Sequence, residues 1–279
     1  MYGALRLAVF LVAAFLAPAA GAPAGEASPL KPSGHGAVRA VVDGDTLVLA
    51  LDKPVPGAEA AGASGAEVEV RLVGIQAPKL PLGRRGFKAW PLAGEAREAL
   101  ESLTLGRELE LSFGGRRMDR HGRLLAHLHD GQGRWIQGEM LSLGLARVYG
   151  FADNRRLLPE MLALERDARE AGRGIWGHPY YRVLRPEETA GHIDSFQLVE
   201  GRVRAAAVVR RRGYLNFGED WRSDFTISIS PKARRLFEAE GMDIEGLAGR
   251  RVRVRGWLKS YNGPMIEATH PEQVEVLDE

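Results

Sequence analysis

Alternating apolar and polar residues predict the strands of a first domain. Residues 38–50 place valines and leucines on both sides of an Asp-Gly-Asp turn, which suits a strand that bends or bulges at Gly44. In residues 67–72, valine and leucine alternate with charged residues, so one face is buried and Arg71 stands on the open face. Alternation predicts further strands over residues 108–113 and 124–128.

Apolar residues at helical spacing predict three helices around these strands. The first begins at Pro91 and ends at Gly106, a short one covers residues 137–146, and a longer one covers residues 157–171. Strands followed by an inserted helix, more strands and terminal helices are typical of a five-stranded OB barrel, whose open face commonly binds oligonucleotides. We therefore predict a mainly β, α+β fold with an OB domain over residues 37–178.

The last part of the chain repeats this order of elements. Strand patterns over residues 200–209, 213–217 and 224–229 precede a helical pattern over 231–240 and strand patterns over 251–258 and 264–269. The order predicts a second, smaller OB-like barrel over residues 197–279, after a linker at 179–196. Its many arginines and interleaved aromatic residues are typical of a surface that binds single-stranded nucleic acid. Equally, the arginines could be the solvent-exposed face of an amphipathic strand.

The first residues have the pattern of a targeting segment. One arginine, a short apolar run and small residues around Gly21 match a secretory signal peptide over residues 1–22, with an uncleaved membrane anchor as the alternative. Residues 23–36 are rich in alanine, proline, glycine and serine, and predict a flexible linker. We expect an exported protein, periplasmic or secreted, without stable membrane insertion after signal cleavage.

Composition adds few constraints. The chain has 279 residues, 45% of them hydrophobic, and no cysteine, so its stability must come from core burial rather than from disulfides. The formal net charge of +2 and the pI of about 9.0 permit a polyanionic partner without identifying one.

Three short blocks carry the candidate chemistry. The first is Asp43-Gly44-Asp45-Thr46, which alone is more often a solvated turn than a site. The others are residues 68–79 and residues 119–126, which contain Asp-Arg-His-Gly-Arg. In this order, the blocks resemble the staphylococcal nuclease (thermonuclease) family. The resemblance extends over about residues 38–177 and implies the same OB fold.

The resemblance implies Ca²⁺-assisted phosphodiester cleavage, in which carboxylates hold the ion and two arginines neutralise the phosphate. Asp45 matches the first metal carboxylate, and Arg71 and Arg123 match the two arginines, which would bind substrate and assist catalysis. Where family enzymes read Asp-Thr-Pro-Glu or Asp-Ala-Pro-Glu, this chain reads Gln76-Ala77-Pro78-Lys79. The metal set thus becomes Asp45, the Gln76 oxygen and the Ala77 carbonyl.

The general base of the family is replaced by Lys79, an ammonium without an acceptor lone pair. Asp45 alone would face Arg71, Arg123 and Lys79, a balance that attracts phosphate but does little for Ca²⁺. Lys79 could still act beside the phosphate as an electrophile and a substrate contact. His121 would stack on a base. Tyr149 would belong to a base-facing aromatic wall or, equally well, pack in the core.

Alternatives remain open for both the site and the function. A carboxylate from Glu69 or Glu95, or the basic loop at residues 80–90, could rebuild the site. With the resemblance, the sequence favours an exported, weak or altered phosphodiesterase of the endonuclease class that binds single-stranded DNA, RNA or nucleotide phosphate. A non-catalytic module that binds nucleic acid or an envelope partner is the alternative, and a purely structural envelope protein is a third hypothesis.

Overall fold

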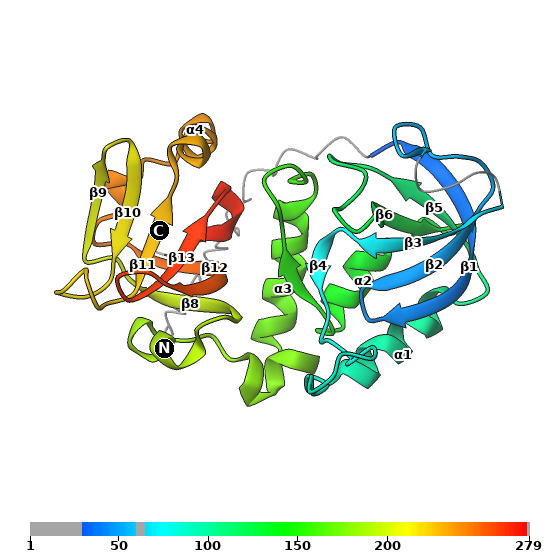
Figure 1. Ribbon diagram of the computed structural model, residues 1–279, viewed down its shortest axis with the longest axis horizontal. Helices are drawn as coiled ribbons and strands as arrows, with labels where there is room; N and C mark the ends of the chain where they lie inside the picture. The colour runs from blue at the N-terminus through cyan, green and yellow to red at the C-terminus, as the bar shows by residue number, and fades with distance from the viewer. Residues whose placement is uncertain (1–29, 60–64, 278–279) are drawn as a thin grey trace, which may run out of the picture.

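Two β domains lie on either side of helix α3 (Leu158–Glu170) in the computed structural model, which describes residues 30–59 and 65–277 (Figure 1). The segment predicted as a signal peptide, residues 1–22, and residues 23–29 of the predicted linker lie outside the described residues. Within the described part, no helix is both long and apolar enough to span a membrane.

The first domain is a closed barrel in the strand order β1-β2-β3-β6-β5. Its strands are β1 (Pro32–Asp43), β2 (Thr46–Leu51), β3 (Glu67–Leu72), β5 (Glu108–Ser112) and β6 (Leu124–Asp130). The other elements are β4 (Gly74–Gln76), α1 (Ala93–Thr104), α2 (Ile136–Ser142) and β7 (Arg147–Tyr149). All neighbours in the barrel are antiparallel except β3 and β6, which are parallel. The predicted fold class, an OB barrel of mixed β and α structure, is confirmed.

The alternation read from the sequence explains why the barrel closes. Leu47, Leu49, Val70 and Leu72 are fully buried in one core, while Glu67 and Glu69 on β3 are exposed. Burying one face of each strand contributes about 1.5–3 kcal/mol for each large aliphatic side chain. The helices α1 and α2 then cover the barrel with Leu100 and other apolar residues.

The second domain is a seven-stranded sheet with the helix α4 (Pro231–Ala239). Its strands are β8 (Phe196–Arg202), β9 (Ala205–Val209), β10 (Arg212–Asn216), β11 (Thr226–Ile229), β12 (Arg251–Ser260), β13 (Pro264–Ala268) and β14 (Val274–Val276).

The strand pairings of this sheet follow the same cycle as those of the first barrel. They run β9-β10-β11-β13-β12-β8, and β11 and β13 are parallel, as β3 and β6 are. Only Val203 and Arg204 separate β8 from β9, so these two strands act as one bent strand that joins both ends of the cycle. The helix α4 lies between β11 and β12 in the chain, the place that α1 holds between the third and fourth barrel strands of the first domain. The second domain therefore has OB topology.

Two predicted linkers are more ordered than the sequence suggested. Residues 32–36, assigned to a flexible linker, form the start of β1 and pair with β5. Their glycines have a structural reason, because a Cβ on Gly36 would lie 2.6 Å from the Ala50 carbonyl oxygen. Residues 179–196, predicted as a linker, contain the 3-10 helices η3 (Pro179–Tyr181) and η4 (Pro186–His192).

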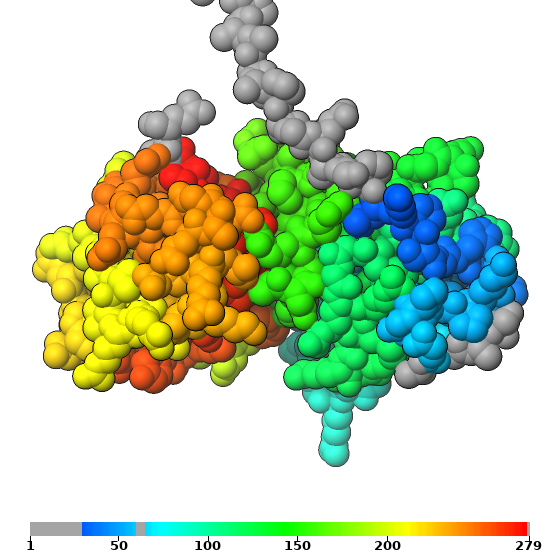
Figure 2. Space-filling view, turned by 90° about the horizontal axis from the view of Figure 1, so that it is seen from above, coloured from blue at the N-terminus to red at the C-terminus, as the bar shows by residue number. Residues whose placement is uncertain are grey.

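Buried charges join the two domains. Arg255 on β12 is 2% exposed, and its guanidinium lies 2.8 Å from Glu165 on α3 and 2.5 Å from Glu275. Glu165 is itself fully buried and accepts a hydrogen bond from the Val148 amide at 2.5 Å. The second domain is thus held against α3, as the space-filling view also shows (Figure 2).

We predict that Arg255→Met destabilises the protein by about 3–5 kcal/mol, because the buried carboxylate of Glu165 loses its cation from the second domain. The measurement is urea unfolding of the full chain. Arg204→Ala is the control, since Arg204 forms an exposed pair with Glu219 at 2.9 Å and its loss should cost at most about 1 kcal/mol. Equal, small losses in both variants would contradict the prediction.

Candidate functional site

The turn between β1 and β2 places two carboxylates side by side inside the protein. Asp43 ends β1 and Asp45 follows Gly44, and both carboxylates are buried, Asp45 completely. Gly44 is required here, because a Cβ at this position would lie 2.7 Å from the Cβ atoms of Ala77 and Ala96. The turn is therefore packed against the rest of the site rather than solvated.

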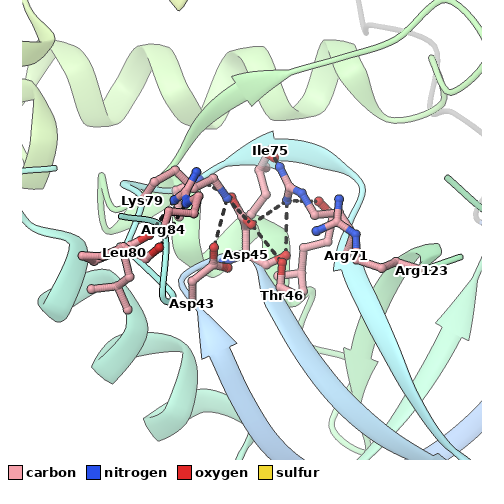
Figure 3. A network of polar contacts seen from close by, with 12 residues as sticks. Asp43, Asp45, Thr46, Arg71, Ile75, Lys79, Leu80, Arg84 and Arg123 are labelled. Carbon is pink, nitrogen blue, oxygen red and sulfur yellow. Dashed lines mark hydrogen bonds and ion pairs between the residues drawn. The ribbon is translucent and has the colours of Figure 1, made fainter. Parts of the chain in front are cut away.

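Lys79 fills the space beside these carboxylates. Its Nζ donates to the two oxygens of Asp45 at 2.7 and 2.6 Å, and to Asp43 Oδ2 at 3.1 Å (Figure 3). The Ala77 amide donates to Asp45 Oδ2 at 2.7 Å, and the Thr46 hydroxyl donates to Asp45 Oδ1 at 3.2 Å. Every oxygen of the Asp45 carboxylate thus has at least two donors.

Arg71 approaches Asp45 from the opposite side to Lys79 (Figure 3). Its Nη1 lies 3.0 Å from Asp45 Oδ1 and donates to the backbone carbonyls of Asp45 and Leu72, while Nη2 donates to the Ile75 carbonyl at 2.6 Å. The side chain is only 11% exposed. Arg71 was predicted to stand on the open face of its strand, but its guanidinium turns inward to the buried carboxylate.

The cluster is electrically balanced, with the two aspartates against Lys79 and Arg71. Burial disfavours ionised Asp45, but the charges of Arg71 and Lys79 outweigh it and hold the pKa of Asp45 well below its ordinary value. Burial and the neighbouring Asp45 charge instead raise the pKa of Asp43. The predicted picture of a lone Asp45 facing three cations is therefore wrong, because Asp43 also binds Lys79.

The residues present do not fit the calcium ion that the resemblance implies. Ca²⁺ needs several free oxygen ligands, and the oxygens of Asp45 already bind an ammonium, a guanidinium and an amide. The Gln76 oxygen accepts from buried Arg147 at 2.8 and 3.2 Å, so it too is engaged. A divalent cation would bring two positive charges to a cluster whose carboxylates are already neutralised.

A different group of metal-capable side chains lies elsewhere on the first domain. His35, Asp52 and Glu108 bring ligand atoms within 4.8 Å of one another, and all three residues are exposed. His35 lies on β1, Asp52 directly follows β2, and Glu108 begins β5. This exposed group carries no functional assignment.

Beside the cluster lies an open groove of about 440 Å³. Arg71 and Arg123 both line it, as predicted. The parallel pairing of β3 and β6 sets Arg71 opposite Leu125, which is two residues after Arg123 in the chain. His121 and Tyr149 also line it. Lys79 does not, so the proposed substrate contact from its ammonium has no support in the geometry.

The charged groups of the groove are paired among themselves. Arg123 Nε and Nη2 lie 2.8 and 2.7 Å from Asp119 Oδ2 rather than facing Asp45. Arg116 pairs with Asp153 at 3.1 Å. Arg71 is already balanced by buried Asp45, which leaves three arginines of the lining, Arg116, Arg120 and Arg123, against Asp119 and Asp153. The groove therefore keeps an excess of positive charge.

The carboxylates that could have rebuilt a metal site lie elsewhere. Glu69 and Glu95 are exposed, and neither lines the groove. In the loop after Lys79, Arg84 donates to the Leu80 and Pro81 carbonyls and covers the ring of Phe87 at 3.7 Å. The loop therefore folds on itself and supplies no acid to the cluster.

Sequence reasoning missed two arginines of the site. Arg147 is buried behind Gln76 because β4 and β7 pair Gln76 with Arg147. Burial lowers the pKa of Arg147 to about 10, and its guanidinium lies 4.5 Å from the centre of the Phe196 ring. Arg116 follows β5 after two glycines. Neither residue has a local signal, since tertiary pairing alone brings each to the site.

Comparison with known proteins identifies the family of this chain. Residues 69–178 match the family model described as staphylococcal nuclease homologue. The chain is also 31% identical over 162 residues to Protein ParB of Escherichia coli, an alignment that covers 55% of this chain and 78% of that protein. The chain therefore belongs to the staphylococcal nuclease family, and its first domain supports a nuclease-like role in nucleic-acid binding.

We predict that Lys79→Ala destabilises the protein by about 3 kcal/mol at pH 7, because two buried carboxylates are then left with Arg71 alone. In the native chain the charges of Arg71 and Lys79 hold the pKa of Asp45 below its ordinary value, and removing the ammonium raises that pKa toward the unfolded value. The loss should therefore shrink as the pH falls below about 4 and the variant takes up protons. Urea unfolding at both pH values measures it. Lys88→Ala, at an exposed lysine of the following loop, should cost little, and a pH-independent loss in Lys79→Ala would contradict the account.

Proposed function

We propose that this protein binds single-stranded nucleic acid in the Arg71–Arg123 groove and does not hydrolyse it by a Ca²⁺-dependent mechanism. One observation carries the proposal: Lys79 Nζ lies within 2.7 Å of both oxygens of Asp45. The ammonium is a cation built into the chain, and it satisfies the carboxylate that a metal would need.

The groove supports the binding half of the proposal. Its excess of arginine matches a phosphate backbone, because guanidinium groups donate in a planar fork to phosphate oxygens. The exposed ring of Phe151 and the ring of Tyr149 lie in the same groove and meet edge to face at 4.9 Å between centroids. Such rings are platforms on which unpaired bases stack.

The cluster supports the non-catalytic half. Losing a general base typically lowers the rate about 10²- to 10⁴-fold, and Lys79 has no lone pair with which to accept a proton. No carboxylate other than Asp119 and Asp153 lines the groove among the described residues, and each of these binds an arginine. An altered phosphodiesterase would require Lys79 to leave two buried aspartates.

Export of the chain belongs to the same proposal, resting on the signal-like pattern of residues 1–22.

The test is binding of a fluorescent oligonucleotide to the native chain and to Arg123→Ala. We expect a several-fold weaker Kd at low salt in the variant, and a salt-dependence slope reduced by about one, because one phosphate contact is lost.

Arg134→Ala is the matched control for this experiment. Arg134 pairs with Asp130 at 2.6 Å in the same i,i+4 geometry as Arg123 with Asp119, but it does not line the groove. Unchanged binding in Arg123→Ala, or an equal loss in Arg134→Ala, counts against the groove. Ca²⁺-dependent cleavage of the oligonucleotide by the native chain, abolished in Asp45→Ala, overturns the non-catalytic half.

A further inference from the structure

The groove of the first domain does not end at its own barrel. A second hollow of about 220 Å³ shares Tyr149 and Phe151 with the groove, and continues between the domains to Trp257 and Lys259 on β12. The two hollows are therefore adjacent, and the pair of rings at Tyr149 and Phe151 forms their common wall. In the first domain, β4 fixes that wall by pairing Gly74 with Tyr149.

Exposed aromatic rings mark this path. Phe151 is 46% exposed and Trp257 is 41% exposed, and both line the second hollow. Tyr261, in the turn after β12, is 66% exposed but lines neither hollow. Large rings left in water along one continuous hollow are unusual unless something covers them. Trp257 Nε1 donates to the Tyr149 hydroxyl at 3.0 Å, so rings from the two domains meet directly.

The second hollow runs along β12, the fourth strand of the second OB domain, and not over its second and third strands, β10 and β11. In OB folds the turn between the fourth and fifth strands also contacts oligonucleotides. Here that turn follows β12 and carries Tyr261. Lys259 at the end of β12 has a side chain that is 58% exposed and lies 3.7 Å from Glu267, its acidic neighbour in the hollow.

We infer that a single strand of nucleic acid runs from the arginine groove over Tyr149 and Phe151 and onto Trp257 and Lys259 of the second domain. The inference rests on the proposed function and extends it, because it makes the ligand a strand long enough to span both domains. The occupant must be single-stranded, since bases paired in a duplex cannot stack on these rings. The interdomain contacts of Arg255 hold the two halves of the path in one arrangement.

The test compares oligonucleotides of about 4 and about 15 nucleotides, at the two ends of the range that a single OB fold covers. The native chain should bind the long strand much more tightly than the short one. Trp257→Ala should weaken binding of the long strand about tenfold and leave the short strand unchanged. Trp257→Phe keeps a ring but loses the hydrogen bond to Tyr149, so it should retain most of the affinity.

Trp221→Ala is the matched control, because Trp221 is 49% exposed but lines neither hollow. Equal affinity for the two lengths, or for a duplex of the long strand, overturns the inference while leaving the groove intact. Unchanged affinity of Trp257→Ala for the long strand also overturns the inference and leaves the groove intact. Failure of the native chain to bind either length overturns the proposed function and the inference together.

Discussion

The short contacts of the Lys79 ammonium with the buried carboxylate of Asp45 decide the chemistry of this molecule. Burying the charge of Asp45 inside the protein costs free energy unless cations compensate it. The chain supplies two cations from its own side chains, Lys79 and Arg71. The same compensation in the family pattern comes partly from a metal. A fixed internal cation makes the turn at Gly44 stable without any ion, and it also removes the ligands that an ion would use.

The groove and the cluster share Arg71, so structure and recognition are coupled there. Arg71 donates to the carbonyls of Asp45, of Leu72 at the end of β3 and of Ile75 in β4, and it still lines the groove. Its neighbour Arg123 is set by the Asp119 turn. The groove is therefore held in shape by a neutral, closed cluster on one side, and by Tyr149 and the second domain on the other.

Much of the fold could be predicted from the sequence, and less of the site. Alternation in residues 67–72 and helical spacing after Pro91 are local signals, and they matched β3 and α1. The start of β1 was missed because glycines required for close strand approach resemble a spacer. The exchange of a carboxylate for Lys79 is visible in the sequence, but the direction of the ammonium is not. Arg147 behind Gln76 depends on pairing between strands far apart in the chain.

The most direct measurement of the central claim is a calorimetric Ca²⁺ titration of the native chain and of Lys79→Glu. Both are best made in an Asp52→Ala background, which removes the exposed group of His35, Asp52 and Glu108. We expect no binding to the native chain at millimolar Ca²⁺, and saturable binding to the Lys79→Glu variant, where three carboxylates would surround the site. Native binding that is lost in Asp45→Ala would contradict it.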